Sequence, residues 1–177
     1  FSNFNPDDML TNKQISESSS KTNYCSPPDE DFLYNNTLWP ENSKLYGHGY
    51  EIISIAVSHD GSLIASGGKS QTEQHSKLIL WDAAKNSLLK KLDGHVLTIV
   101  QIEFSYDDKY ILTVSRDRSL CLFAKTADGK DYHLIQMEKE THARIIWGCS
   151  WAKDSELFLT GSRDNFLKIW KKINAIF

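Results

Sequence analysis

Three histidines recur at one interval along the chain: His48, His95 and His142 are each 47 residues apart. Imidazole groups supply metal ligands and general acid–base catalysts, so this pattern could carry chemistry. The turn residues Asp60, Asp107 and Asp154 keep the same interval. A metal site needs ligands that converge on one ion, whereas residues at one equal interval fall in successive copies of a repeat. We therefore predict that each histidine is hydrogen-bonded inside its own repeat and that the three do not form one site.

No catalytic or cofactor-binding motif accompanies the histidines. The sequence has no G-x-S-x-G, no P-loop and no H-E-x-x-H, and Gly67 and Gly68 end a predicted strand. Cys25, Cys121 and Cys149 are odd in number and lack C-x-x-C spacing, which argues against a disulfide framework and a zinc site. We predict a protein that is not an enzyme, with no cofactor and no metal, in the cytoplasm and also in the nucleus.

Short strands must position the histidines. Ile53, Ile55 and Val57 alternate with Ser54 and Ala56, which is the period of a strand with one buried face. Turn residues follow, and then further β-branched and apolar runs. The first repeat is therefore predicted to hold a turn and three more strands, His59–Ser62, Leu63–Ser66, Leu78–Trp81 and Leu88–Leu92. Four short strands in this order form one antiparallel sheet.

The segments His95–Phe123 and Thr141–Trp170 repeat this order of elements. In the last copy, strands are predicted at Ile145–Trp151, up to Ser162 and up to Trp170. The first copy has five extra residues between its second and third strands, and the second copy lengthens its last connection. Insertions that fall in connections are expected when each copy is a self-contained block.

Composition sets the outer limits. The chain has 177 residues, 40% of them hydrophobic, and its net charge of −3 gives no global basic field. No apolar run approaches the roughly 18 residues of a membrane helix. Residues 1–37 are rich in Asn, Ser, Asp and Pro, so we predict a polar, mobile linker there and the repeats within 38–177. Because the chain begins with Phe1, we expect it to belong to a longer protein.

The repeats resemble those of the WD-repeat β-propeller family, whose unit runs from Gly-His to Trp-Asp. Gly47-His48 and Trp81-Asp82 keep both signatures, and Gly94-His95 keeps the first. The resemblance implies an all-β fold with blades of four antiparallel strands. About three blades are present, at residues 47–82, 94–124 and 141–171. Three blades cannot close a ring, so we expect an open, incomplete propeller.

In that family a His, a Ser or Thr, an Asp and a Trp form a buried hydrogen-bonded chain in each blade. By position, the implied residues of the three repeats in turn are His48, Ser66 and Trp81; His95, Thr113 and Asp117; and His142, Thr160, Asp164 and Trp170. Ser70 stands at the Asp position of the first repeat and Phe123 at the Trp position of the second. Only the third repeat keeps the whole set.

A closer resemblance rests on stretches that WD repeats in general do not require, among them LYGHGYEI at residues 45–52 and RIIW at 144–147. These are similar to the second propeller of the WD-repeat scaffold subunits of the Elongator complex. The resemblance implies a non-catalytic scaffold or assembly subunit that supports tRNA wobble-uridine modification, with other Elongator subunits as partners and a weak tRNA contact. A free-standing propeller that binds peptides at its central opening is the alternative, and nothing in the sequence supports an enzyme.

The ends of the repeat array are expected to leave open sheet edges. Leu38–Tyr46 would be the outer strand of a preceding blade, and the last repeat lacks a fourth strand. Unpaired edges are templates for association, so we expect missing residues or another chain to complete them.

Arginines are the part of the pattern that packing does not explain. Arg116, Arg118 and Arg163 flank the turn aspartates, and Arg144 precedes a strand. One interpretation is a solvated face with local Arg–Asp pairing. The other is a basic rim that binds a protein partner or RNA phosphate.

Overall fold

The structure, a computed structural model, describes residues 43–129 and 131–171. The predicted linker at residues 1–37 and its boundary lie outside these ranges and stay predictions. The sequence predicts a strand at Leu38–Tyr46. Residues 43–46 form no strand, so the prediction is wrong for these four residues, and the rest of it lies outside the described ranges. A strand needs a hydrogen-bonded neighbour, and the sheets of the described residues offer these residues none. Within the same ranges, no helix has the length and apolar character needed to cross a membrane.

Eleven described strands form three antiparallel sheets, with the orders β1-β2-β3-β4, β5-β6-β7-β8 and β11-β10-β9. Blade 1 consists of β1 (Ile52–Val57), β2 (Leu63–Gly68), β3 (Leu78–Asp82) and β4 (Ser87–Leu92). Blade 2 consists of β5 (Ile99–Phe104), β6 (Tyr110–Ser115), β7 (Leu120–Lys125) and β8 (Tyr132–Glu138). Blade 3 consists of β9 (Ile146–Trp151), β10 (Leu157–Ser162) and β11 (Leu167–Lys171). The five extra residues of the first repeat lie in the β2–β3 connection, which holds the short 3₁₀ helix η2 (Glu73–His75).

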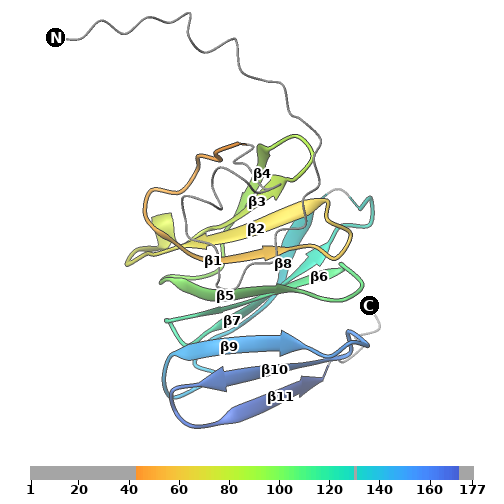
Figure 1. Ribbon diagram of the computed structural model, residues 1–177. Helices are drawn as coiled ribbons and strands as arrows, with labels where there is room; N and C mark the ends of the chain where they lie inside the picture. The colour runs from red at the N-terminus through yellow and green to blue at the C-terminus, as the bar shows by residue number, and fades with distance from the viewer. Residues whose placement is uncertain (1–42, 130, 172–177) are drawn as a thin grey trace, which may run out of the picture. The chain divides into compact units, whose positions relative to one another are not determined.

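The blades follow one another side by side. Figure 1 shows the three sheets in succession, from yellow and green in blade 1 to blue in blade 3. The first strand of each blade contacts the first strand of the next, β1 with β5 and β5 with β9. The described sheets form an open arc, which confirms the predicted all-β fold and incomplete propeller.

Each first strand carries one extra residue in a β-bulge close to its start. The register shifts between Ile52 and Ser54 in β1 and between Ile99 and Gln101 in β5. In blade 3, Gly148 pairs with Gly161 but Ile146 pairs with Ser162, so Trp147 is the extra residue. A bulged residue leaves the ladder and its side chain is re-aimed. Trp147 is accordingly 54% exposed although it lies within a strand.

The hydrophobic core lies between blades. One cluster joins blade 1 to blade 2, with Ala65, Ile99 and Phe104 among its fully or nearly fully buried members. A second joins blade 2 to blade 3, where Leu112 and Val114 meet Ile146. Because every sheet carries apolar side chains on both faces, a blade becomes stable only against its neighbours.

Gly67 lies at a tight contact between blades 1 and 2. A Cβ atom at Gly67 would lie 2.7 Å from Ser54 Oγ and 2.9 Å from Ile99 Cβ. Gly161 occupies the corresponding position of blade 3, and a Cβ atom there would meet nothing within 4 Å. The same small residue therefore has a packing role in one blade and none in the other.

We predict that Gly67→Ala lowers the unfolding free energy of the 177-residue chain by about 1–3 kcal/mol, because the added methyl group overpacks the contact with Ile99. Gly161→Ala is the matched control and should change it by no more than about 0.5 kcal/mol. Urea unfolding followed by tryptophan fluorescence measures both. Equal effects of the two substitutions would contradict the assigned packing.

Candidate functional site

Blade 3 contains a continuous hydrogen-bonded chain across its sheet. Trp170 Nε1 donates to Thr160 Oγ1 over 2.9 Å, and Thr160 Oγ1 lies 2.9 Å from His142 Nε2. His142 Nδ1 lies 3.0 Å from an Asp164 carboxylate oxygen. The chain is consistent with one tautomer, in which Nδ1–H donates to the carboxylate and Nε2 accepts from the hydroxyl. Thr160 and the His142 side chain are fully buried, so the group is shielded from water.

Blade 2 builds a shorter version with one added residue. His95 Nε2 lies 2.8 Å from Thr113 Oγ1, and His95 Nδ1 lies 2.8 Å from Ser119 Oγ and 3.4 Å from Asp117 Oδ2. Ser119 in turn donates to Asp117. Phe123 ends this chain without a donor. The sequence pattern missed Ser119, because the third repeat has Phe166 at the same position and gives no hint of a polar residue there.

The network of blade 1 contains the tryptophan, the serine and the histidine but no aspartate. Trp81 Nε1 donates to Ser66 Oγ over 2.7 Å, and Ser66 Oγ lies 2.7 Å from His48 Nε2. No aspartate follows: Ser70 instead accepts from and donates to Thr98 of the next blade through its main chain. Burial, followed by the charge of Lys91, lowers the pKa of His48, so this histidine is neutral at physiological pH.

The aspartates of blades 2 and 3 are held ionised. Burial alone would raise the pKa of Asp164, but hydrogen bonds from Phe166 N–H, His142 and Ala143 N–H bring it to about 2. Burial also opposes ionisation of Asp117, and bonds from its neighbours outweigh that effect and hold its pKa well below the usual range. These carboxylates stay anionic acceptors at neutral pH and do not act as proton donors.

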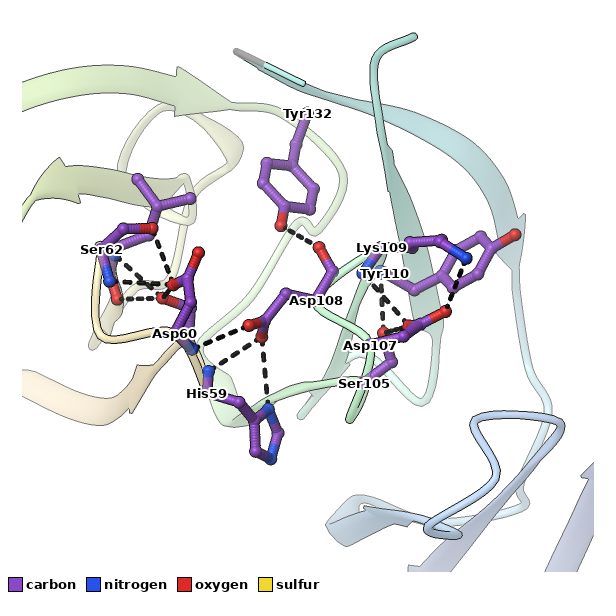
Figure 2. Close-up of polar contacts among 11 residues, drawn as sticks. His59, Asp60, Ser62, Ser105, Asp107, Asp108, Lys109, Tyr110 and Tyr132 are labelled. Carbon is purple, nitrogen blue, oxygen red and sulfur yellow. Dashed lines mark hydrogen bonds and ion pairs between the residues drawn. The ribbon is translucent and has the colours of Figure 1, made fainter. Parts of the chain in front are cut away.

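A separate polar cluster joins the β1–β2 turn of blade 1 to the β5–β6 turn of blade 2 (Figure 2). These turns lie at the other ends of the strands from the turns that carry Asp117 and Asp164. One carboxylate oxygen of Asp108 accepts from His59 N–H at 2.9 Å and lies 3.2 Å from His59 Nδ1. The other oxygen accepts from Asp60 N–H at 2.9 Å, and the Tyr132 hydroxyl donates to the Asp108 carbonyl at 2.6 Å. Asp108 adopts φ 53°, where aspartate is tolerated. The cluster fastens the two turns together, and sequence reasoning missed it because its partners lie 49 residues apart.

The four arginines lie in two connected turns and the loop between them. Arg118 Nη2 pairs with Glu140 at 2.8 Å. Arg116, Arg144 and Arg163 are exposed, and no ion pair joins them to any acidic group in the described part of the chain. Local Arg–Asp pairing, one of the two interpretations from the sequence, is therefore absent at these three positions. Asp117 and Asp164 point inward, with side chains 12% and 7% exposed.

A lysine or arginine occupies the same position in each of the three blades. Lys69, Arg116 and Arg163 are 47 residues apart, and their main-chain N–H groups donate to equivalent carbonyls of Glu51, Thr98 and Ile145. In blade 1 the cation is neutralised, because Lys69 Nζ lies 2.8 Å from a Glu51 carboxylate oxygen. Blades 2 and 3 have Thr98 and Ile145 at that position. The unpaired positive charge is thus concentrated on blades 2 and 3.

Catalytic groups do not converge in the described residues. A cleft of about 590 Å³ beside η2 is lined by Tyr50, Glu51, Lys69 and His75 among others. Lys69 and Glu51 pair with each other, and His75 packs edge-to-face on Tyr50. Across residues 43–129 and 131–171, no three His, Cys, Asp or Glu side chains are arranged to hold a metal ion.

Both described cysteines are poor nucleophiles. Burial, followed by the charge of Asp117, raises the pKa of Cys121 to about 12, and burial, followed by the charge of Glu103, also raises the pKa of Cys149. A thiol with so high a pKa is protonated at neutral pH, whereas the thiolate is the reactive form. Cys121 and Cys149 are therefore packing residues of the two cores.

The fold and the blade networks define a β-propeller repeat protein. The family model described as WD domain, G-beta repeat matches residues 39–82, 86–123 and 135–171. The chain belongs to the WD-repeat family.

The chain is similar over most of its length to proteins named Elongator complex protein 2. The protein of Drosophila melanogaster is 45% identical over 150 residues, covering 83% of this chain and 19% of that protein. Those of Arabidopsis thaliana and Homo sapiens are 43% and 41% identical over 150 and 157 residues, each covering 84% of this chain. They are covered over 18% and 19% of their own length. The chain thus spans about a fifth of the length of these relatives.

We predict that Thr160→Val lowers the unfolding free energy by about 1 kcal/mol more than Thr113→Val does. Both substitutions conserve volume and remove a buried hydroxyl, but Thr160 serves both His142 and Trp170, whereas Thr113 serves His95 without a tryptophan. Leaving a buried polar group unpartnered costs on the order of 1–3 kcal/mol. Urea titrations of the two variants give the comparison, and a larger loss for Thr113→Val would refute the arrangement.

We also predict that Asp164→Asn lowers the melting temperature at pH 7 and weakens its acid dependence. The folded-state pKa of about 2 lies below the value of about 3.9 in an unfolded chain, so the carboxylate stabilises the fold above pH 4. That contribution is lost as the pH falls from about 4 to 2. Melting curves at pH 7, 4, 3 and 2 test this, with Asp154→Asn in an exposed turn as control. Parallel curves for Asp164→Asn and the unaltered chain would contradict it.

Proposed function

We propose that the chain is part of a non-catalytic scaffold subunit of the Elongator complex, which supports tRNA wobble-uridine modification through assembly with the other subunits. The observation that carries the proposal is identity of 41–45% over more than four-fifths of the chain to proteins named Elongator complex protein 2. A WD-repeat fold by itself hosts many functions, so the proposal rests on this identity and not on the fold.

The chemistry of the described residues supports a scaffold. The histidines and the aspartates of the blade networks are engaged inside single sheets, and we propose that their role is structural throughout. The described cysteines are protonated, and the ionisable groups in the cleft beside η2 are paired or packed. An assembly subunit needs stable surfaces and no activated nucleophile.

The two end faces of the arc support a larger assembly. Ile55 and Val57 are 66% and 55% exposed, while Ile102 and Phe104, 47 residues later, are 3% and 2% exposed. Leu167 is 64% exposed, while Leu120 at the same position of blade 2 is 2% exposed. Apolar positions that are buried between blades elsewhere are therefore open at both ends. We propose that further blades, from the same protein or another chain, cover these faces.

Partners follow from the same proposal. The other Elongator subunits are the expected protein partners, in the cytoplasm and the nucleus. A weak contact with tRNA is the second expectation, and the exposed arginines of blades 2 and 3 are the described surface with the charge for it.

We predict that the full-length protein, purified from its own cells through an affinity tag, brings the other Elongator subunits with it in mass spectrometry. The matched control is an unrelated WD-repeat protein carrying the same tag. A preparation free of those subunits would contradict the proposal. If the protein alone binds short peptides in solution and no subunit accompanies it, the free-standing peptide-binding module is the correct function.

A further inference from the structure

The turns of blades 2 and 3 and the loop between them form one continuous surface, which we call the arginine surface. It comprises Ser115–Arg118, Thr141–Trp147 and Ser162–Arg163. Hydrogen bonds connect its parts: Thr141 N–H and Oγ1 both donate to the Arg118 carbonyl at 3.1 Å. Ser162 Oγ and Arg163 N–H donate to the carbonyls of the Arg144–Ile145 stretch. The parts of the surface are therefore joined by main-chain carbonyls that accept from main-chain N–H groups and from the hydroxyl groups of Thr141 and Ser162.

On the arginine surface the negatively charged side chains are largely buried and three of the positively charged side chains are exposed. The carboxylates of Asp117 and Asp164 face inward to histidines and main-chain N–H groups, as described above. The guanidinium groups of Arg116, Arg144 and Arg163 face outward without an acidic partner among the described residues. An anionic ligand would meet these cations without displacing an existing ion pair, so it would gain the full charge-assisted interaction.

Trp147 is an exposed aromatic residue of the arginine surface. It is the bulged residue of β9, next to Ile146, whose pairing partner Ser162 adjoins Arg163. A tryptophan that projects from a strand and is 54% exposed offers a ring for stacking. An apolar peptide anchor needs a pocket, whereas a nucleobase needs only a flat ring. Exposed guanidinium groups and an exposed aromatic ring on one surface are the combination that binds phosphates and stacks bases in single-stranded nucleic acid.

We infer that the arginine surface binds a single-stranded nucleic acid segment, with Arg116, Arg144 and Arg163 contacting phosphates and Trp147 stacking on a base. The inference rests on the proposed function only for the choice of RNA as the biological ligand. Phosphate and base are common to RNA and DNA, so the surface chemistry alone does not distinguish them. Because the net charge of the chain is −3, attraction to nucleic acid comes from this surface and not from the chain as a whole. With about three phosphate contacts, the affinity is modest and falls as the salt concentration rises.

Fluorescence anisotropy with labelled oligouridylate and oligothymidylate of about 12 nucleotides tests the inference on the full-length protein. Three phosphate contacts predict an affinity loss of roughly 20-fold for oligouridylate between 50 and 200 mM salt. Arg116→Glu with Arg163→Glu should weaken binding at least about tenfold at 50 mM salt. The charge-matched control, Lys109→Glu with Lys153→Glu, changes exposed turns at the opposite ends of the same two blades and should leave binding within about twofold.

Substitution of Trp147 tests base stacking, which depends less on salt concentration than the phosphate contacts do. Trp147→Ala should weaken oligouridylate binding about fivefold or more at both salt concentrations, and Trp147→Phe should restore most of it. Equal affinity for the two oligonucleotides supports recognition of phosphate and base alone. Tighter binding of oligouridylate supports an added contact to the ribose 2′-hydroxyl.

Two results would overturn the inference. One is oligonucleotide binding that the paired arginine reversal leaves unchanged. The other is equally tight binding of a polyglutamate peptide that depends on the arginines but not on Trp147, which would assign the surface to an acidic protein segment. Co-purification of Elongator subunits with the Arg116→Glu, Arg163→Glu protein is measured in parallel. Loss of subunits from the unaltered protein contradicts the proposed function, whereas loss of oligonucleotide binding with subunits retained concerns the arginine surface alone.

Discussion

Contact between neighbouring sheets is the constraint on which the other features depend. Gly67 brings blade 1 close to Ile99 of blade 2, and Val114 and Ile146 belong to one buried cluster between blades 2 and 3. Since the apolar side chains of each sheet are buried by the next sheet, the relative placement of blades is set by packing. That placement brings the turns of successive blades side by side. The Asp108 cluster and the arginine surface both lie where two such turns meet.

Polar bonds fix the register of these contacts. Gln101 of β5 accepts from Cys149 N–H at 3.1 Å and donates to the Cys149 carbonyl at 2.9 Å, so one side chain satisfies both main-chain groups of a residue in the next blade. Glu103, two residues on, accepts from Trp151 N–H and from Ser150 at 3.2 Å. Burial raises the pKa of Glu103, and these bonds oppose that shift. Apolar faces alone tolerate sliding, whereas bonds at alternate residues of one strand do not.

The repeat pattern predicted the strands, and the resemblance to WD-repeat proteins implied the residues of the blade networks; both depend on residues within one repeat. Spacing relates His142 to His95 and His48, whereas the roles of Thr160 and Trp170 were implied by the resemblance. Contacts between repeats were not predictable in this way, since Asp108 differs from the glycine and serine at its position in the other blades. Gln101 likewise differs from Ser54 and Gly148, its counterparts 47 residues away. Such positions vary between repeats because each contact between blades has its own shape, and a periodic pattern averages over them.

The arginine surface arises from the same turn that builds the blade network. In blades 2 and 3 the turn directs its aspartate inward to the histidine, and the residue before the aspartate, Arg116 or Arg163, is exposed. Blade 1 shows what happens without the aspartate: Ser70 bonds to the next blade, and the exposed Lys69 is paired with Glu51. The inward aspartate of blade 3 accepts hydrogen bonds from its histidine and from two main-chain N–H groups, and it forms no ion pair with the neighbouring arginine. The turn of the blade therefore carries a cation without an acidic partner among the described residues, and two adjacent blades contribute these cations to the surface that also holds Trp147.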